Sequence, residues 1–96
     1  MLLDVGCKIN SVVTLKLTSG EEIIATLVEE HADYIKVGKP RVLVNAGQGI
    51  GMSSYLITAD PDKSVKMNRN TVVVLEPTDK EFATQYTQNT TGLITL

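Results

Sequence analysis

The sequence predicts an all-β domain of short antiparallel strands that is followed by a short C-terminal helix. Two alternating apolar runs, separated by the turn Ser19-Gly20, form a predicted β-hairpin near the start of the chain. A second Val-rich run, Val72 to Leu75, follows a polar Asn-Arg-Asn segment. Because the chain has no Trp and few other aromatic residues, its core must consist of Val, Ile and Leu, which favours a sheet over a helical bundle.

The length and composition predict one small domain. A chain of 96 residues with 43% apolar residues buries roughly two-thirds of its unfolded surface, enough for one core. We expect a single domain over residues 1–96, with a small barrel or sandwich in about 10–77 and the helix and tail in 78–96. The net charge of -2 argues against a broad nucleic-acid-binding face, although a local basic patch remains compatible with it.

The chain carries no signal for a membrane. Met1 to Asp4 contain no basic region, and no apolar run approaches the ~20 residues that span a bilayer. We therefore expect a cytoplasmic protein without membrane association.

The first predicted hairpin consists of Val12 to Thr18 and of Glu22 to Glu29 or Glu30. In the first strand the apolar residues alternate with polar ones, which predicts one buried face. The second strand has apolar residues on both faces, with Ile24 and Val28 on the second. We expect such a strand where a sheet bends into a barrel or meets another subunit. A helix is compatible with the composition, but β-branched residues and the preceding turn argue against it.

The middle of the chain predicts shorter elements. Tyr34 to Val37 and Arg41 to Asn45 are expected as two strands separated by Gly38-Lys39-Pro40, because Pro cannot donate to a ladder. Ala46 to Gly51 is expected as a Gly-rich loop, and Ser53 to Ala59 as a strand because its residues alternate.

The last predicted strands follow a strong turn signal, Asp60-Pro61-Asp62-Lys63. Val65 to Asn68 is expected as a short strand, Arg69-Asn70 as a tight turn, and Thr71 to Glu76 as the last strand.

The tail predicts a helix. Thr78 and Glu81 have the spacing of a capping box, with Thr78 as the N-cap. Phe82 and Tyr86 lie on one face of a helix that runs to about Gln88, and Gly92 is the expected break.

No motif in the sequence predicts catalysis, a metal site or a cofactor. The segment Gly47 to Gly51 lacks the spacing of phosphate-binding loops, so we interpret it as a hairpin loop. One His, His31, and one Cys, Cys7, supply too few ligands for zinc, and no nucleophile motif accompanies His31. We therefore expect no enzyme and Cys7 as a small buried residue. Glu21, Glu22, Glu29 and Glu30 are expected at solvated strand ends.

Two groups of basic residues have two interpretations. They comprise Lys36, Lys39 and Arg41, and Lys63, Lys66 and Arg69. Basic side chains near loops can neutralise phosphates, but lysines on edge strands also prevent aggregation of sheets. The sequence alone does not separate these alternatives.

The order of the strands and two short blocks resemble the Sm-like (LSm) family. In the first block Gly20, Ile23, Ala25 and Leu27 occupy the family's Gly and apolar positions, with Ala in place of the second Gly. The family's Asp and Asn positions fall on His31 and Ile35 here. In the second block Arg69-Asn70 stands where the family has Arg-Gly, and the strand Val72 to Leu75 follows. The Lys-Pro-Arg segment and the Thr-Asp-Lys-Glu-Phe tail are similar to Sm-like proteins of bacteriophages.

The resemblance implies a fold and a function. The implied fold is a small, strongly bent, five-stranded antiparallel barrel, and the implied assembly is a homo-oligomeric ring of roughly five to seven subunits. Such a ring is expected to bind single-stranded RNA or DNA at its inner rim, with a role in RNA processing or regulation. If the chain is encoded by a phage, its location is the host cytoplasm. The implied nucleic-acid-binding residues are His31, Asp33, Tyr34, Lys36, Asn68, Arg69 and Asn70.

Each of these residue types suits the implied role. Tyr34 or His31 can stack on a base, Asn68 and Asn70 can hydrogen-bond base edges, and Arg69 can contact phosphate. The alternative function is a structural or assembly protein that uses the barrel only for contacts with other proteins. Ring formation is expected to cover Ile24 and Val28.

Overall fold

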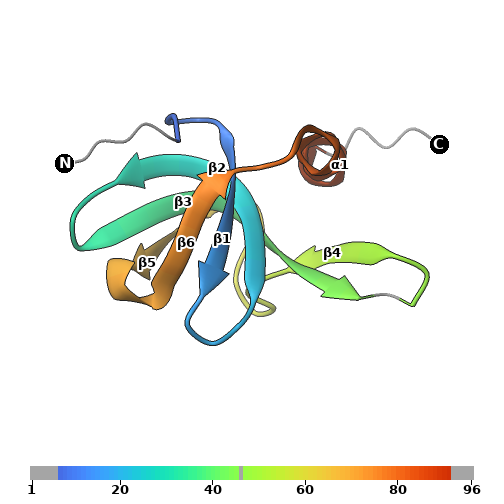
Figure 1. The fold of residues 1–96 in the computed structure, drawn as a ribbon, viewed down its shortest axis with the longest axis horizontal. Helices are drawn as coiled ribbons and strands as arrows, with labels where there is room; N and C mark the ends of the chain where they lie inside the picture. The colour runs from blue at the N-terminus through green and yellow to red at the C-terminus, as the bar shows by residue number, and fades with distance from the viewer. Residues whose placement is uncertain (1–6, 46, 92–96) are drawn as a thin grey trace.

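The computed structural model describes residues 7–45 and 47–91, and these form a bent antiparallel sheet with one C-terminal helix (Figure 1). The chain is mostly β, as the sequence predicts. The predicted hairpin loop contains Ala46, and the predicted helix break is Gly92; both residues lie outside the described ranges. The elements are β1 (Val12–Leu17), β2 (Glu22–Glu30), β3 (Tyr34–Asn45), β4 (Ile50–Ser54), β5 (Ser64–Asn68), the 3-10 helix η1 (Arg69–Thr71), β6 (Val72–Pro77) and α1 (Lys80–Thr91).

Within the described residues the sheet has six strands, one more than the five that the Sm-like resemblance implies. Their order is β4-β3-β2-β1-β6. Strand β5 lies off this path and pairs with residues 34–38 of β3. All neighbouring strands are antiparallel. Among the described residues β5 and β6 do not pair with each other, so the sheet is not closed into a barrel.

The hairpin of β1 and β2 forms the centre of the core, and its two strands confirm the predicted hairpin. The turn includes Gly20 at φ 103°, a left-handed conformation that glycine adopts without steric cost. The inward side chains alternate along both strands as a half-buried sheet requires. The core residues are Val13, Leu15, Leu17, Ile23, Ala25, Leu27, Ile35, Val37 and Met67, with Cys7 packed against them at partial exposure.

Strand β3 runs without interruption through Gly38-Lys39-Pro40, where the sequence predicts a break between two strands. The pairs Thr26–Gly38 and Ile24–Arg41 show that one residue of β2 faces two residues of β3 at this point. Lys39 adopts φ 49°, and Pro40 lies at the resulting bulge, where its missing N–H disrupts no regular ladder. The bulge bends β3, so that its first half pairs with β5 and its second half with β4.

The predicted strand Ser53 to Ala59 is wrong. Strand β4 begins at Ile50 and ends at Ser54, and Tyr55 to Ala59 lie outside any strand. The alternation of these residues does not reflect a buried face, since Ile57 is 90% exposed. The predicted turn at Asp60 is present, because the backbone N–H of Lys63 donates to the carbonyl of Asp60 at 3.2 Å.

Helix α1 begins one residue later than predicted, and its N-terminal cap is Asp79 instead of Thr78. The Asp79 carboxylate accepts a hydrogen bond from the backbone N–H of Glu81 at 3.2 Å. Thr78 is engaged elsewhere, because its N–H donates to Val12 and its hydroxyl pairs with that of Thr14 at 2.8 Å. Thr78 therefore extends the β1–β6 ladder.

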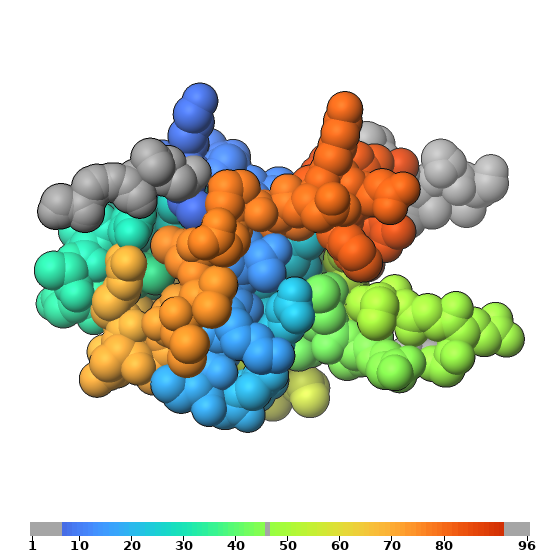
Figure 2. Space-filling view, viewed as in Figure 1, coloured from blue at the N-terminus to red at the C-terminus, as the bar shows by residue number. Residues whose placement is uncertain are grey.

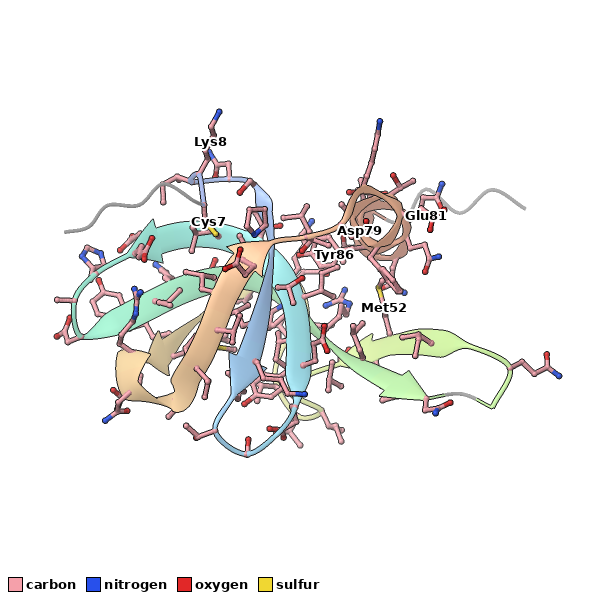
Figure 3. All side chains as sticks on the ribbon, viewed as in Figure 1. Cys7, Lys8, Met52, Asp79, Glu81 and Tyr86 are labelled. Carbon is pink, nitrogen blue, oxygen red and sulfur yellow. The ribbon has the colours of Figure 1, made fainter. Side chains whose placement is uncertain are left out.

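The helix is attached to the outer side of the sheet through Tyr86, which is directed from α1 toward the strands in Figure 3. The Tyr86 hydroxyl lies 3.0 Å from the carbonyl oxygen of Gly38 and 3.0 Å from the hydroxyl of Thr26. Ile24, on the second face of β2, is 1% exposed within the single chain. Ring formation is therefore not needed to cover Ile24, contrary to the prediction.

Arg41 makes a second connection between α1 and the sheet. Its side chain is 6% exposed, its Nε donates to Asn89 Oδ1 at 3.0 Å, and its Nη1 donates to the carbonyl of Pro61 at 3.0 Å. A third contact, at 3.7 Å, joins Nη2 to Asp62. Arg41 therefore holds the turn at 60–63 and α1 against β3, and is unavailable as a surface cation.

No helix within the described ranges is long and apolar enough to cross a bilayer.

Candidate nucleic-acid interface

The structure brings together the two segments for which the Sm-like resemblance implies nucleic-acid contacts. The loop from His31 to Asp33 joins β2 to β3, and Asn68 to Asn70 join β5 to β6 (Figure 1). Tyr34 and Asn68 are directly paired across β3 and β5. The backbone N–H of Arg69 donates to the carbonyl of Asp33 at 3.0 Å. The antiparallel pairing of β3 and β5 therefore places both loops at one end of the sheet.

The Arg69 side chain connects the two loops. Its Nη1 donates to Oε2 of Glu30 at 2.8 Å and contacts the carbonyl oxygen of His31 at 3.4 Å. Both partners of this ion pair are 37% exposed. An exposed pair of this kind contributes about 0–1 kcal/mol, so a phosphate can compete with Glu30 for the guanidinium.

His31 and Tyr34 form a stacked pair on the surface. Their ring centroids are 4.4 Å apart and the ring planes differ by 27°. Oε1 of Glu29 accepts a hydrogen bond from the Tyr34 hydroxyl at 3.2 Å and lies 2.9 Å from Nε2 of His31. The stack is thus held in place by Glu29.

This arrangement shifts two pKa values. The hydrogen bond from His31, followed by that from Tyr34, lowers the pKa of Glu29 below its ordinary value. Desolvation, followed by the hydrogen bond to Glu29, raises the pKa of Tyr34. Both shifts favour an ionised Glu29 beside a neutral phenol at neutral pH.

Two lysines lie beside the stacked pair. Nζ of Lys66 lies 4.7 Å from the centroid of the Tyr34 ring, which is within the range of a cation–π contact. Lys36 is the direct cross-strand partner of Lys66. Like charges in this position repel each other, so a bound anion would stabilise the pair.

The predicted binding residues and basic groups differ in their exposure and in where they lie in the fold. Asp33, Asn68 and Asn70 are exposed at the loops, where their side chains can reach a ligand. Of the two basic groups, Lys36, Lys66 and Arg69 lie at this end of the sheet, whereas Arg41 is buried against α1.

Sequence reasoning missed the role of Glu29 and Glu30, which it placed at a solvated strand end. Both carboxylates pair with residues of the proposed site. The signal in the sequence is their position directly before His31. Their presence balances the charge of the site, because Glu29, Glu30 and Asp33 oppose Lys36, Lys66 and Arg69.

The loops around Tyr34 and Arg69, with the strand ends beside them, carry several groups that can bind a ligand. Among residues 7–45 and 47–91 no cluster of three His, Cys, Asp or Glu side chains could hold a metal ion. The two loops and the adjacent ends of β3 and β5 present the stacked pair of His31 and Tyr34, the Arg69 guanidinium and two exposed amides, together with Lys36 and Lys66. No protein-family model matches the chain, and no curated protein matches it either.

Proposed function

We propose that this chain is an Sm-like protein that forms a homo-oligomeric ring and binds single-stranded RNA at the loops around Tyr34 and Arg69. The single observation that carries the proposal is the convergence of these loops from distant parts of the sequence. Arg69 contacts Asp33 through its backbone and His31 and Glu30 through its side chain. The Sm-like resemblance assigns nucleic-acid contacts to the same two loops.

The open sheet edges support ring formation. Among the described residues β5 pairs only with β3, and β6 pairs only with β1. Each strand therefore offers unpaired backbone groups along one side, and pairing β5 of one copy with β6 of the next would satisfy both. On β6, Val73 is 62% exposed and Val74 is 41% exposed, so the same contact would bury apolar surface.

Binding would use the site in a specific way. A phosphate would replace Glu30 as the partner of Arg69, and a second phosphate would lie near Lys36 and Lys66. A base would stack on the outer face of the His31–Tyr34 pair, because every base has a π-face. Repetition around a ring multiplies these weak contacts through effective concentration, which compensates for the balanced charge of each site.

The experiment is binding of fluorescent single-stranded RNA at several salt concentrations, with the molar mass of the protein measured in the same sample. We expect a closed oligomer whose affinity decreases with salt, since counterions are released on binding. Arg69→Ala should weaken binding by about tenfold, which is the order of magnitude expected for removal of one charged hydrogen bond. Lys80→Ala, which removes one exposed positive charge on α1, is the matched control and should bind as the wild type does.

The second candidate function is assembly by protein contacts alone. Its supporting observation is that His31, Tyr34 and Arg69 are already engaged with Glu29 and Glu30. An oligomer that ignores RNA and single-stranded DNA at low salt would establish this function. A monomer that ignores both would reject the ring and the nucleic-acid site together.

A further inference from the structure

A groove lies at the other end of the molecule, between α1 and a projecting arm. The arm consists of residues 43–45 of β3 and the paired strand β4, and it extends from the bent sheet in Figure 1. Figure 2 shows the molecule hollowed between the arm and α1. The groove has a volume of about 620 Å³, and its far wall is the outer face of the β1–β2 hairpin.

One side of the groove contains an incomplete sheet edge. The pairing of β2 with β3 starts at Ile23–Val42, yet β3 continues to Asn45. Within the described part of the chain, residues 43–45 pair with β4 on one side and with no strand on the other. No residue of β2 lies beside residues 43–45, because the turn at Gly20 connects the start of β2 to the end of β1. About 10 Å of strand edge is therefore open where β2 would continue.

The walls of the groove are apolar. They are formed by Ile24, Val42, Val44, Ile50 and Phe82. Val44 is 41% exposed and Ile50 is 49% exposed, although both lie in paired strands. Exposed apolar side chains beside an open strand edge are the features that strand-adding peptides use, the edge for affinity and the pockets for specificity.

The rim of the groove is acidic. Glu21, Glu22 and Asp79 line it, opposed by one cation, Lys16. All three carboxylate residues are exposed, and Asp79 stands at the start of α1 (Figure 3). An excess of carboxylates repels phosphates and attracts lysine and arginine side chains. The charge therefore favours a basic peptide as the occupant and disfavours a nucleic acid.

We propose that this groove binds an extended, basic and apolar segment of a partner protein, which adds as a short strand to residues 43–45 of β3. Alternate side chains of the segment would enter the apolar groove, and its basic side chains would reach Glu21, Glu22 and Asp79. The site is separate from the loops around Tyr34 and Arg69, and the inference holds whether or not those loops bind RNA. It assigns the chain a protein partner on its outer surface.

The test uses a short synthetic peptide of alternating lysine and valine, titrated into uniformly ¹⁵N-labelled protein. We expect backbone amide signals of Leu43, Val44 and Asn45 to shift with saturation, together with those of Glu22 and Phe82. A peptide of alternating glutamate and valine should not bind. The lysine-valine peptide with N-methylated backbone should also fail, because it has the same charge but no donors for strand pairing.

Matched variants test the contribution of charge. Glu22→Lys should weaken the peptide about fivefold, an estimate for one exposed charge reversal. Glu81→Lys makes the same change on α1 outside the groove lining and should leave the affinity within about twofold. Circular dichroism of each variant establishes that the fold is retained.

Several outcomes would overturn the proposal. They are the absence of shifts at millimolar peptide, shifts confined to other parts of the sheet, or equal binding of the N-methylated peptide. Displacement of the peptide by single-stranded RNA at the same amides would assign the groove to nucleic acid. Concentration-dependent shifts of Leu43 to Asn45 without peptide would assign it to a second copy of this chain.

Discussion

Tyr86 of α1 donates its phenolic hydrogen to the carbonyl oxygen of Gly38 at 3.0 Å, at the point where β3 bends. The ring is 2% exposed, and its oxygen also lies 3.1 Å from the carbonyl of Lys39. Burial raises the pKa of Tyr86, which keeps the phenol protonated as a donor. This one side chain joins the helix to the bulge that directs β3 from β5 to β4.

We expect Tyr86→Phe to lower the free energy of unfolding by about 1–2 kcal/mol, because the buried carbonyl of Gly38 would lose its donor. Urea denaturation followed by circular dichroism measures the change. The matched control is Tyr55→Phe, since the Tyr55 hydroxyl makes no hydrogen bond within the described residues; it should cost less than about 0.5 kcal/mol. Equal effects of the two variants would remove the assigned role of the Tyr86 hydroxyl.

Arg41→Met should loosen the attachment of α1 to the sheet, which Tyr86 still holds, without unfolding the core. The variant removes the hydrogen bonds from Arg41 to Asn89 and to the carbonyl of Pro61, and the loss of each should cost about 0.5–1.5 kcal/mol. Hydrogen exchange should increase for the amides of α1 more than for those of β1 and β2. Lys63→Met, an exposed basic residue in the adjacent turn, should leave exchange in α1 unchanged.

Alanine should destabilise the protein at Gly20 but not at Gly38. Gly20 has φ 103°, which an L-residue adopts at a cost of about 1–2 kcal/mol, although nothing lies within 4 Å of the added methyl group. At Gly38 the methyl group would meet Val28 Cγ2 at 3.5 Å, an ordinary contact distance. Denaturation should therefore show a destabilised Gly20→Ala and a Gly38→Ala within about 0.5 kcal/mol of the wild type. The reverse order would contradict the backbone argument.

Titration of Glu29 tests the cluster around Tyr34. Nuclear magnetic resonance of its carboxyl carbon should give a pKa below the ordinary 4.5, and His31→Ala should raise it more than Lys36→Ala does. A lowered pKa contributes stability that is present above the ordinary value and is lost as pH falls through the folded value. His31→Ala should therefore show a shallower loss of stability below pH 4.5 than the wild type. Identical titrations would mean that the stack does not hold Glu29 in solution.

The proposed ring makes the exposed residues of β6 critical. Val73→Asp would place a carboxylate where an adjacent copy is proposed to pair, so the oligomer should dissociate toward smaller species in analytical ultracentrifugation. Ile57→Asp is the control, because Ile57 is 90% exposed and lies outside every strand. An oligomer that survives Val73→Asp but not Ile57→Asp would place the subunit contact elsewhere.

Much of the sheet could be predicted because local patterns decide it. The alternation along β1 and β2 and the turn at Gly20 specify that hairpin without any distant information. The strand break predicted at Pro40 is wrong because a bulge can accommodate proline inside a strand. The bulge depends on the pairing of β3 with β2. Thr78 was mistaken for the cap because its hydroxyl is taken by Thr14, 64 residues away. Neither partner is visible from local spacing.

The candidate site could also be predicted from the sequence only in part. The two loops could be named from short sequence blocks, since turn residues stand at fixed offsets from apolar strands. The ion pair of Glu30 with Arg69 could not, because it joins residues 39 positions apart and depends on the register of β3 with β5. Local spacing also left open whether Arg41 was a surface cation, which its burial under α1 now decides.

The sheet order also determines how the chain reaches its native state. The β1–β2 hairpin joins neighbouring segments and can form within microseconds, whereas β6 must return to β1 from the far end of the sheet. Closing that long loop has an entropic cost that no contact offsets until β1 is already in place. We therefore expect β6 to pair with β1 late in folding, after the first five strands have formed.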